Sequence, residues 1–401
     1  MSRSGDPSVS NRNTLVLLHI GFVVTGVFTV LLGPVLPLLA QRWSLTDSQT
    51  GNFFTAQFGG LLAGVALSSY LLKNRYRPAF VSGFALMGAG ALALGRGPWE
   101  TALPSLFCMG FGNGFITAAT NLWVGEAMPE AKARALSFVN FSWTFGAVSC
   151  PFIFQAFASP RAFTQALVAI SGAALLLAVV FAGSQVDAIR WIAGPKAAAG
   201  AQAGKFDRSA IIFALLFFLY VGAETAAGGW LATYSRRVST SSGTAWILTP
   251  AFFWGGMMVG RGSGTLALRH IPERPVVQAG SLFGLCGLAL LTQSKSLGLI
   301  YASSFVTGLG FSVIFPILFA WMAGHYGAEA RRVTGFMLTI AELGAATLPW
   351  VVGVISAASG SIRIGLAVLL VDIFGVFIFA SLIHLPSPVP LDRAGRREIA
   401  T

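Results

Sequence analysis

The sequence predicts an all-α membrane protein with about twelve transmembrane helices, arranged as two similar six-helix bundles. Its 401 residues are 55% apolar and only 10% charged, whereas an ordinary soluble domain has about a quarter charged residues. Apolar stretches recur along nearly the whole chain at the length of about 20 residues that a bilayer core requires. The second half of the chain also repeats short motifs of the first. These three observations together define the fold class.

Twelve stretches are predicted to cross the membrane. They lie at 14–40, 51–72, 78–97, 101–126, 134–157, 162–184, 209–232, 245–268, 276–293, 297–324, 334–357 and 361–384. The least apolar interior stretch contains KAAAGAQAGK and predicts a linker between two halves. The expected organisation is a tail at 1–13, a first bundle at 14–184, the linker at 185–208, a second bundle at 209–384 and a tail at 385–401.

The basic residues indicate the orientation of the chain. The net charge is +12, but its lysines and arginines are scattered through short loops, which argues against a nucleic-acid partner. With a cytoplasmic N-terminus, 18 of the 26 Lys and Arg residues fall in cytoplasmic segments and 7 in outer segments. Cytoplasmic loops of membrane proteins carry such an excess. We therefore expect an inner-membrane protein of bacterial type, in contact with lipid, monomeric, with both termini in the cytoplasm.

An internal repeat supports the division into halves. Three pairs of stretches lie 196 to 198 residues apart: FGGLLAG at 58–64 with WGGMMVG at 254–260, MGFG at 109–112 with TGLG at 307–310, and Gly146 and Pro151 with Gly344 and Pro349. A shared offset in separate stretches indicates a duplicated six-helix unit. This architecture is typical of carriers whose substrate site lies near the midplane between two rocking halves.

Polar side chains inside the fourth and fifth spans are the first candidate site. The fourth span carries a stripe spaced by four residues: Asn113, Thr117 and Asn121. The fifth span adds Asn140, Trp143 and Thr144. Amides and hydroxyls beside an indole suit a neutral polyhydroxylated ligand, which needs many hydrogen bonds and a flat apolar surface. Hydrogen bonding between helices explains the same residues equally well.

The seventh span contains the most informative single residue. In YVGAETAAGGW, Tyr220 and Glu224 lie one turn apart on one helix face, and Trp230 lies further outward. An ionised carboxylate this far inside a span is costly. Glu224 could therefore bind substrate hydroxyls, bind a coupling ion or carry a proton. A structural carboxyl group that bonds to neighbouring helices is the alternative.

Four further ionisable residues within spans are candidates for coupling or gating. Arg261 is the one basic residue that we place inside a span, and a buried guanidinium should have an acidic partner. Glu342 lies at similar depth and is preferred to Asp372 as that partner. His19 in the first span could relay protons, although a hydrogen-bonded structural role explains it more simply.

The chemistry that the sequence lacks argues against an enzyme. The three cysteines are isolated within spans, and the four histidines are widely separated. No nucleophile with a base, no metal-ligand cluster and no phosphate-binding loop is visible. We therefore predict no catalytic residues, no bound metal and no cofactor, and transport driven by a gradient of H⁺ or Na⁺.

Several motifs resemble one family of sugar carriers. These are YVGAETAAGGW, the pair Gly260 and Arg261, SLTDSQTG, NLWVGEAMPE and LSFVNFSWTFGAVSCP. Together they resemble the fucose-galactose-glucose symporters of the major facilitator superfamily, over most of the chain. The resemblance implies sugar transport coupled to protons or, in some members, sodium. It also implies that Asn121, Asn140 and Glu224 are pocket positions.

The chain departs from that family at two places. Proton-linked fucose carriers have carboxylates in helices one and four, where this chain has Gly33 and Thr117. Coupling through Glu224, coupling to sodium and uncoupled facilitation all remain open. The superfamily's loop signature after helix two keeps Gly64 but has Ser68 in place of the acid. The conformational latch that this loop normally supplies is expected to be weak or built elsewhere.

An exporter of drugs or amphipathic lipids in the same superfamily is the competing interpretation. Such antiporters typically have a Gly-Pro pair with further glycines in helix five. Here AVSC separates Gly146 from Pro151, and no glycine pair follows. We therefore favour a carrier that moves a small polar solute, a hexose or related sugar, by alternating access.

Overall fold

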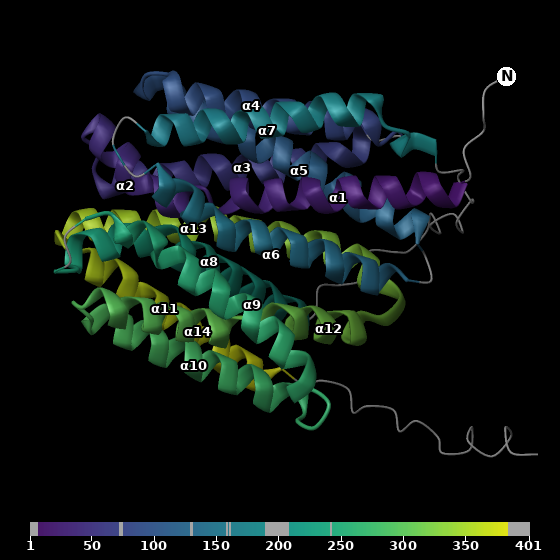
Figure 1. Ribbon diagram of the computed structural model, residues 1–401. Helices are drawn as coiled ribbons and strands as arrows, with labels where there is room; N and C mark the ends of the chain where they lie inside the picture. Colours follow the sequence, from purple (N-terminus) through teal and green to yellow (C-terminus); the bar gives the residue numbers. More distant parts are fainter. Residues whose placement is uncertain are drawn as a thin grey trace, which may run out of the picture.

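The computed structural model describes residues 7–71, 75–128, 131–157, 159, 162–188, 208–240 and 243–383. Within these ranges the regular structure is helical, and the long helices run side by side along one axis (Figure 1). Twelve passes are an even number, so α1 begins and α14 finishes at the same end of the molecule. We call this the terminal end. The opposite end carries the connection between α2 and α3 and is called the closed end, for reasons given below.

The first bundle contains α1 (Pro7–Val30), α2 (Leu32–Trp43), α3 (Asp47–Leu71), α4 (Arg77–Arg96), α5 (Ala102–Ala127), α6 (Lys132–Ala156) and α7 (Phe163–Gly183). In Figure 1 these helices form the upper part, except for α6, which lies beside α8 and α9 of the second bundle. The second bundle contains α8 (Arg208–Val238), α9 (Thr249–Ala267), α10 (Glu273–Gln293), α11 (Leu297–Phe311), α12 (Ile314–Tyr326), α13 (Ala330–Ser359) and α14 (Ile362–Leu382). The twelve-helix fold in two six-helix bundles agrees with the prediction from sequence.

Two of the twelve predicted spans are broken, which corrects the sequence analysis. The span at 14–40 starts earlier, at Pro7, and is divided between α1 and α2 at Leu31. The span at 297–324 is divided between α11 and α12. A proline ring clashes with the carbonyl four residues earlier and lacks an N–H group. Pro34 and Pro316 act in this way on Val30 and Ser312, next to the two breaks.

The predicted tails and linker are only partly within the described residues. Residues 1–6, 189–207 and 384–401 lie outside them. The tail at 1–13 therefore overlaps the start of α1, and most of the linker at 185–208 and the whole tail at 385–401 stay predictions.

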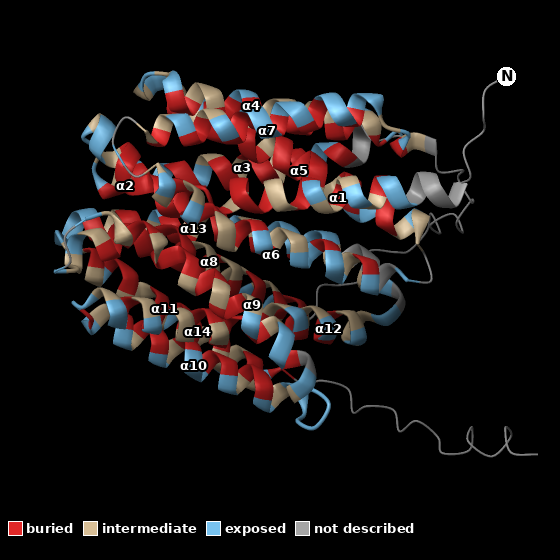
Figure 2. Ribbon diagram, viewed as in Figure 1, coloured by how far each residue is buried: buried red, intermediate tan, exposed pale blue. Residues whose placement is uncertain are grey.

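Apolar side chains on the outer surface identify the face that meets lipid. Ten helical segments of the described chain are long and apolar enough to cross a membrane. Large apolar side chains are exposed on them, including Leu176 at 63%, Val179 at 69% and Val371 at 72%. In Figure 2 the exposed residues lie mostly on the outside of the bundles and the buried ones between helices. Soluble proteins rarely expose so much contiguous apolar surface to water, whereas a membrane protein exposes it to the lipid of the bilayer.

The internal repeat is visible in the way the helices cross. A Cβ atom on Gly60 of α3 would lie 2.2 Å from the carbonyl oxygen of Phe107 on α5. On Gly256 of α9 it would lie 2.2 Å from the carbonyl oxygen of Phe305 on α11. Small residues let helix backbones come this close in lipid, where packing drives association. The two bundles therefore use equivalent glycines at equivalent crossings.

The crossing of α1 with α6 provides a test of this packing. A Cβ atom on Gly146 would lie 2.0 Å from the carbonyl oxygen of Val23, and backbone cannot move aside as a flexible side chain can. Gly146→Ala is expected to lower the melting temperature of the purified protein by several degrees, because overpacking typically costs about 1–3 kcal/mol. Gly172→Ala, at a site with nothing within 4 Å, is the control. Equal melting temperatures for the two variants would contradict the crossing.

Candidate functional site

The two bundles touch mainly from the closed end to the middle of the molecule. α3 packs along α13, α2 against α8, and α6 against α9. At the closed end, the Gln155 side chain donates to the Thr244 hydroxyl at 3.1 Å. Nearer the middle, the Thr55 hydroxyl donates to the carbonyl of Ala346 at 2.9 Å. These contacts join residues of the two halves that are far apart in the chain.

An ion pair holds the closed end together. Asp47 starts α3 and is 7% exposed. Both of its oxygens accept bonds from Arg237 of α8, at 2.6 and 2.5 Å. The hydroxyl of Ser356 on α13 donates to the same carboxylate at 2.5 Å. Paired bonds between a guanidinium and a carboxylate are strong and directional, so these three residues, the closed-end latch, join the two bundles.

The latch was not recognised from sequence, although Asp47 lies within the SLTDSQTG motif. The loop signature that normally supplies a latch has Ser68, whose hydroxyl donates only locally, to the carbonyl of Val65. At the terminal end, Asp187 accepts bonds from the backbone N–H groups of Tyr76 and Arg77, at 2.6 and 3.0 Å. That contact braces one bundle internally. Burial and the nearby Glu126 carboxylate raise the pKa of the Tyr76 hydroxyl, which stays neutral.

Close backbone contact also explains Gly33. A Cβ atom there would lie 2.8 Å from the carbonyl oxygen of Gly228 on α8. A side chain at this position would push the bundles apart at the closed end. The carboxylate that fucose carriers have at the aligned position therefore has no room here in this conformation.

A polar network lies in the middle of the first bundle. The Thr29 hydroxyl oxygen of α1 accepts bonds from the Asn113 side chain at 2.8 Å and from the Trp143 indole N–H at 3.3 Å. Thr117 donates to the Asn113 side-chain oxygen at 3.4 Å. The side-chain amide of Gln57 donates to the carbonyls of Phe28 and Thr29, at 2.9 and 3.1 Å. Asn113, Thr117 and Trp143 are thus brought together as predicted, while Thr29 and Gln57 were missed.

The ionisable residues of the second bundle meet this network near the same depth. Arg261 of α9 donates to the Thr144 hydroxyl of α6 at 3.0 Å. Arg261 also interacts electrostatically with Glu224 of α8, and Glu224 with Glu342 of α13. The expected pairing of Arg261 with Glu342 is therefore wrong, because the carboxylate that interacts electrostatically with the guanidinium is that of Glu224, and within the described residues Arg261 forms no ion pair with Glu342. Sequence depth alone could not distinguish the two, since helix rotation decides which side chain faces the arginine.

Glu224 and its neighbour Tyr220 provide oxygen atoms of the kind that bind a small cation. The Tyr220 hydroxyl interacts with Glu224 and donates to the carbonyl of Phe311 at 2.9 Å. Carboxylate, hydroxyl and carbonyl oxygens suit a hard cation or a transferred proton. Within the described ranges, no three His, Cys, Asp or Glu side chains gather as a metal cluster.

Two buried polar atoms near the network have no hydrogen-bond partner among the residues that the structure describes. One is the side-chain oxygen of Gln57 and the other is the indole N–H of Trp254 on α9. The Trp254 ring meets the Trp143 ring edge-on, with centroids 5.6 Å apart and an interplanar angle of 85°. Leaving such groups unpaired costs about 1–3 kcal/mol each, a cost that a polar ligand would remove. Trp254 lies in the repeat motif WGGMMVG, where sequence comparison showed only duplication.

Other predicted site residues lie elsewhere. Trp230 is fully buried near the closed end and donates to the carbonyl of Pro349 at 2.9 Å. The ring nitrogen of His19 bonds the Ser142 hydroxyl at 2.8 Å within the first bundle. Asp372 is buried in α14, away from Arg261, and one of its oxygens has no hydrogen-bond partner in the described part of the chain. These three residues are not brought to the central network.

Asn121 and Asn140 show where the network opens. Both are exposed and lie on α5 and α6 between the network and the terminal end, whereas Asn113 and Thr144 are buried. The Asn140 amide donates only to the carbonyl of Leu136. Exposed amides within a span are costly against lipid, so they indicate access for water. The latch joins the bundles at the closed end, and these two exposed amides lie on the terminal-end side of the network.

Comparison with known proteins identifies the fold. Residues 18–349 match the sequence profile of the Major Facilitator Superfamily. The chain belongs to this superfamily. Its members are transporters, and this protein is a transporter of the superfamily.

Individual relatives of this superfamily member are distant. It is 26% identical to the glucose/galactose transporter of Brucella abortus over 366 residues, which cover 86% of this chain and 88% of the relative. Among solved structures it resembles a bacterial homologue of the human lysosomal transporter Spinster, in an inward-facing and occupied conformation. That match has a TM-score of 0.78 and 13% identity, and covers 93% of this chain and 96% of the other. The fucose:proton symporter FucP of E. coli matches with a TM-score of 0.62 and 18% identity, covering 93% and 98%. At these identities the structures support the fold alone.

Proposed function

We propose that this transporter carries a hexose or related sugar across the inner membrane by alternating access, as a monomer with both termini in the cytoplasm and in symport with H⁺ or Na⁺. The polar network of the first bundle, at the place where it meets Trp254 and Arg261 of the second, is the observation that carries the proposal. It joins amides, hydroxyls and two indoles, and the latch joins the bundles on its closed-end side. The name of the Brucella relative supports glucose and galactose as first substrates.

The network offers what a neutral sugar requires. The free oxygen of Gln57 can accept a bond from a sugar hydroxyl, and the free N–H of Trp254 can donate one. The indole rings of Trp143 and Trp254 supply apolar surface for the C–H faces of a pyranose ring. Because the two tryptophans come from different bundles, a sugar that lies beside this pair would contact both and could couple its binding to their relative movement.

Coupling is proposed to act through Glu224 and Arg261. A proton or sodium ion at Glu224 would compete with Arg261 for the carboxylate. Arg261 also bonds Thr144 of the other bundle, so a change at Glu224 would alter a contact between the bundles. Ion binding is thereby linked to the conformational equilibrium, as symport requires.

Trp254→Phe tests the sugar site. The variant keeps an aromatic ring but loses the N–H donor and part of the ring area, so the KM for sugar is expected to rise about tenfold, equivalent to about 1.4 kcal/mol. Trp350→Phe, at a half-exposed indole near the closed end, should leave the KM unchanged. An unaltered KM in Trp254→Phe would remove this residue from the site.

The function itself is tested by uptake into proteoliposomes. Labelled glucose, galactose and fucose are offered with an imposed proton gradient, an imposed sodium gradient or neither. Accumulation of one sugar under one gradient identifies substrate and coupling ion together. Equilibration without accumulation would indicate a facilitator, and the absence of uptake of every sugar would contradict the proposal.

Export of amphipathic molecules is the second candidate. A groove of about 460 Å³ lies between α8 and α13 near the terminal end. All seven residues that line it are apolar: Ala210, Ile211, Ala214, Leu215, Phe218, Phe336 and Ile340. Such a groove suits an acyl chain that enters from the bilayer. Proton-driven efflux of an amphipathic dye, together with no sugar uptake, would favour this function.

A further inference from the structure

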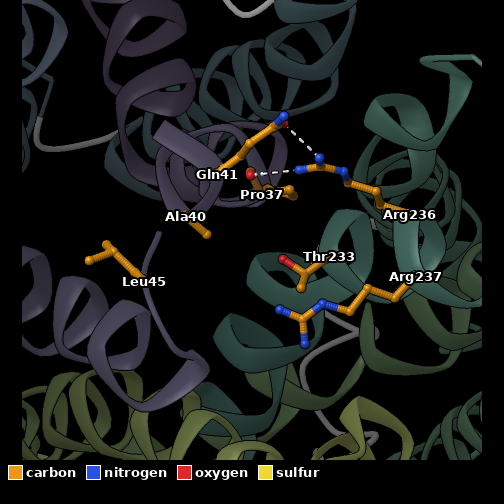
Figure 3. A pocket seen from close by; sticks show the side chains of 7 residues that line it. All are labelled: Pro37, Ala40, Gln41, Leu45, Thr233, Arg236 and Arg237. Atoms are coloured by element: carbon orange, nitrogen blue, oxygen red, sulfur yellow. Dashed lines mark hydrogen bonds between the residues drawn. The ribbon is translucent and has the colours of Figure 1, made fainter. Parts of the chain in front are cut away.

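A second pocket lies at the closed end, separate from the central network. It has a volume of about 340 Å³ and is lined by Pro37, Ala40, Gln41, Leu45, Thr233, Arg236 and Arg237 (Figure 3). The first four residues belong to the first bundle and the last three to α8 of the second. The pocket therefore exists only while the bundles meet at this end. Its volume is within the range of small-molecule sites and suits a molecule the size of a monosaccharide.

The pocket has an excess of positive charge. Arg237 is neutralised by Asp47 in the latch. Arg236 has neutral hydrogen-bond partners: it donates to the carbonyl of Pro37 at 2.7 Å and to the side-chain oxygen of Gln41 at 2.6 Å. Figure 3 shows both bonds crossing from α8 to α2. None of the seven lining residues is acidic, so the charge of Arg236 is left without a counter-charge in the lining.

A buried hydroxyl adds a second binding group. Thr233 is buried, and its hydroxyl oxygen has no hydrogen-bond partner among the described residues. In a helix, a threonine hydroxyl commonly bonds the carbonyl one turn earlier, so its lack of a partner is unusual. In Figure 3 this oxygen points into the space between α8 and α2. A bound oxygen atom would remove the cost of leaving it unpaired.

We propose that this pocket binds a small organic anion of monosaccharide size, a sugar acid, through its carboxylate. The guanidinium of Arg236 pairs with the carboxylate, because its planar donors match that geometry. The hydroxyl of Thr233 and the amide of Gln41 bond the ligand's hydroxyl groups. A ligand that binds residues of both bundles favours the state in which they meet. The anion thus holds the closed end shut and inhibits transport without occupying the central site.

The test compares D-glucuronate with D-glucose, its uncharged counterpart, on the purified full-length protein. In the wild type, glucuronate is expected to raise the melting temperature in a saturable way. Arg236→Gln should weaken this binding at least tenfold and Thr233→Val several-fold, while the response to glucose stays unchanged in both. Arg42→Gln is the matched control, because Arg42 lies at the same end and bonds the carbonyls of Gly95 and Gly97 outside the pocket.

Distance measurements and the affinities of the variants distinguish this pocket from the proposed sugar site at the polar network. Spin labels at exposed Arg96 and Lys295, on opposite bundles at the closed end, should show a narrower distance distribution when glucuronate binds. Wild-type affinity for glucuronate in both pocket variants would place the ligand elsewhere and overturn the proposal. No saturable response at millimolar glucuronate, or a wider distribution, would overturn it too. If Arg236→Gln fails to fold, Thr233→Val carries the comparison. Neither the melting temperature nor the distance between the spin labels depends on sugar transport, so both test this pocket independently of the proposed function.

Discussion

Asp47→Asn is expected to shift the protein from the conformation described here toward the opposite one, and to slow net transport at least tenfold. The substitution keeps the shape of the side chain but removes the charge that Arg237 and Ser356 bind. Each hydrogen bond to a charged group contributes roughly 1.5–3 kcal/mol, and solvent lowers that figure for Arg237, whose side chain is 43% exposed. A loss of about 1.4 kcal/mol already changes the ratio of two states tenfold.

The measurement uses two pairs of spin labels in a variant without native cysteines. One pair, at Arg96 and Lys295, reports the closed end, and the other, at Arg134 and Arg269, reports the terminal end. In Asp47→Asn the first distance should lengthen and the second should shorten. Asp187→Asn is the control, because that carboxylate bonds within one bundle. Unchanged distances in Asp47→Asn would mean that apolar packing alone keeps the end closed.

Glu224→Gln is expected to abolish accumulation of sugar against its gradient, by at least a hundredfold, while exchange of labelled for unlabelled sugar continues. Glutamine retains hydrogen-bonding groups but binds neither a proton nor a sodium ion as a carboxylate does. Arg261 then loses the charge beside it, and the ion no longer affects the contact of Arg261 with Thr144. Both activities are measured in the same proteoliposomes.

Two further carboxylates provide controls for Glu224. Glu342→Gln should have a smaller effect, since the residue interacts with Glu224 and not with Arg261. Asp372→Asn should leave coupling intact, because Asp372 lies in α14 away from the network. Wild-type accumulation in Glu224→Gln would remove the residue from the coupling mechanism, and loss of both accumulation and exchange would make it a substrate ligand instead.

The sequence predicted contacts between neighbouring helices of one bundle better than contacts that depend on how a helix is rotated. Asn113, Thr117 and Trp143 could be grouped in advance, because four-residue spacing and helix adjacency within a bundle are local properties. Trp230 was predicted to bind substrate together with Tyr220 and Glu224. It points to a different side of α8 and bonds the carbonyl of Pro349 instead. The partner of Arg261 was misjudged because equal depth on two helices does not determine their rotation. Gln57 and Trp254 gave no signal, since an unpaired polar atom is recognisable only once its surroundings are known.

The sequence by itself determined the membrane environment, the twelve spans in two halves, the duplication and the positions of the intramembrane charges. These follow from properties that a chain carries locally: the cost of polar groups in lipid, the length of helix that spans a bilayer, and the offset of repeated motifs. Only the tertiary structure decided which end is closed, which carboxylate faces Arg261 and where a second pocket forms. Those features depend on contacts such as Asp47 with Arg237, which are 190 residues apart. Such contacts are made by packing two bundles together, and that packing has no signature in either segment alone.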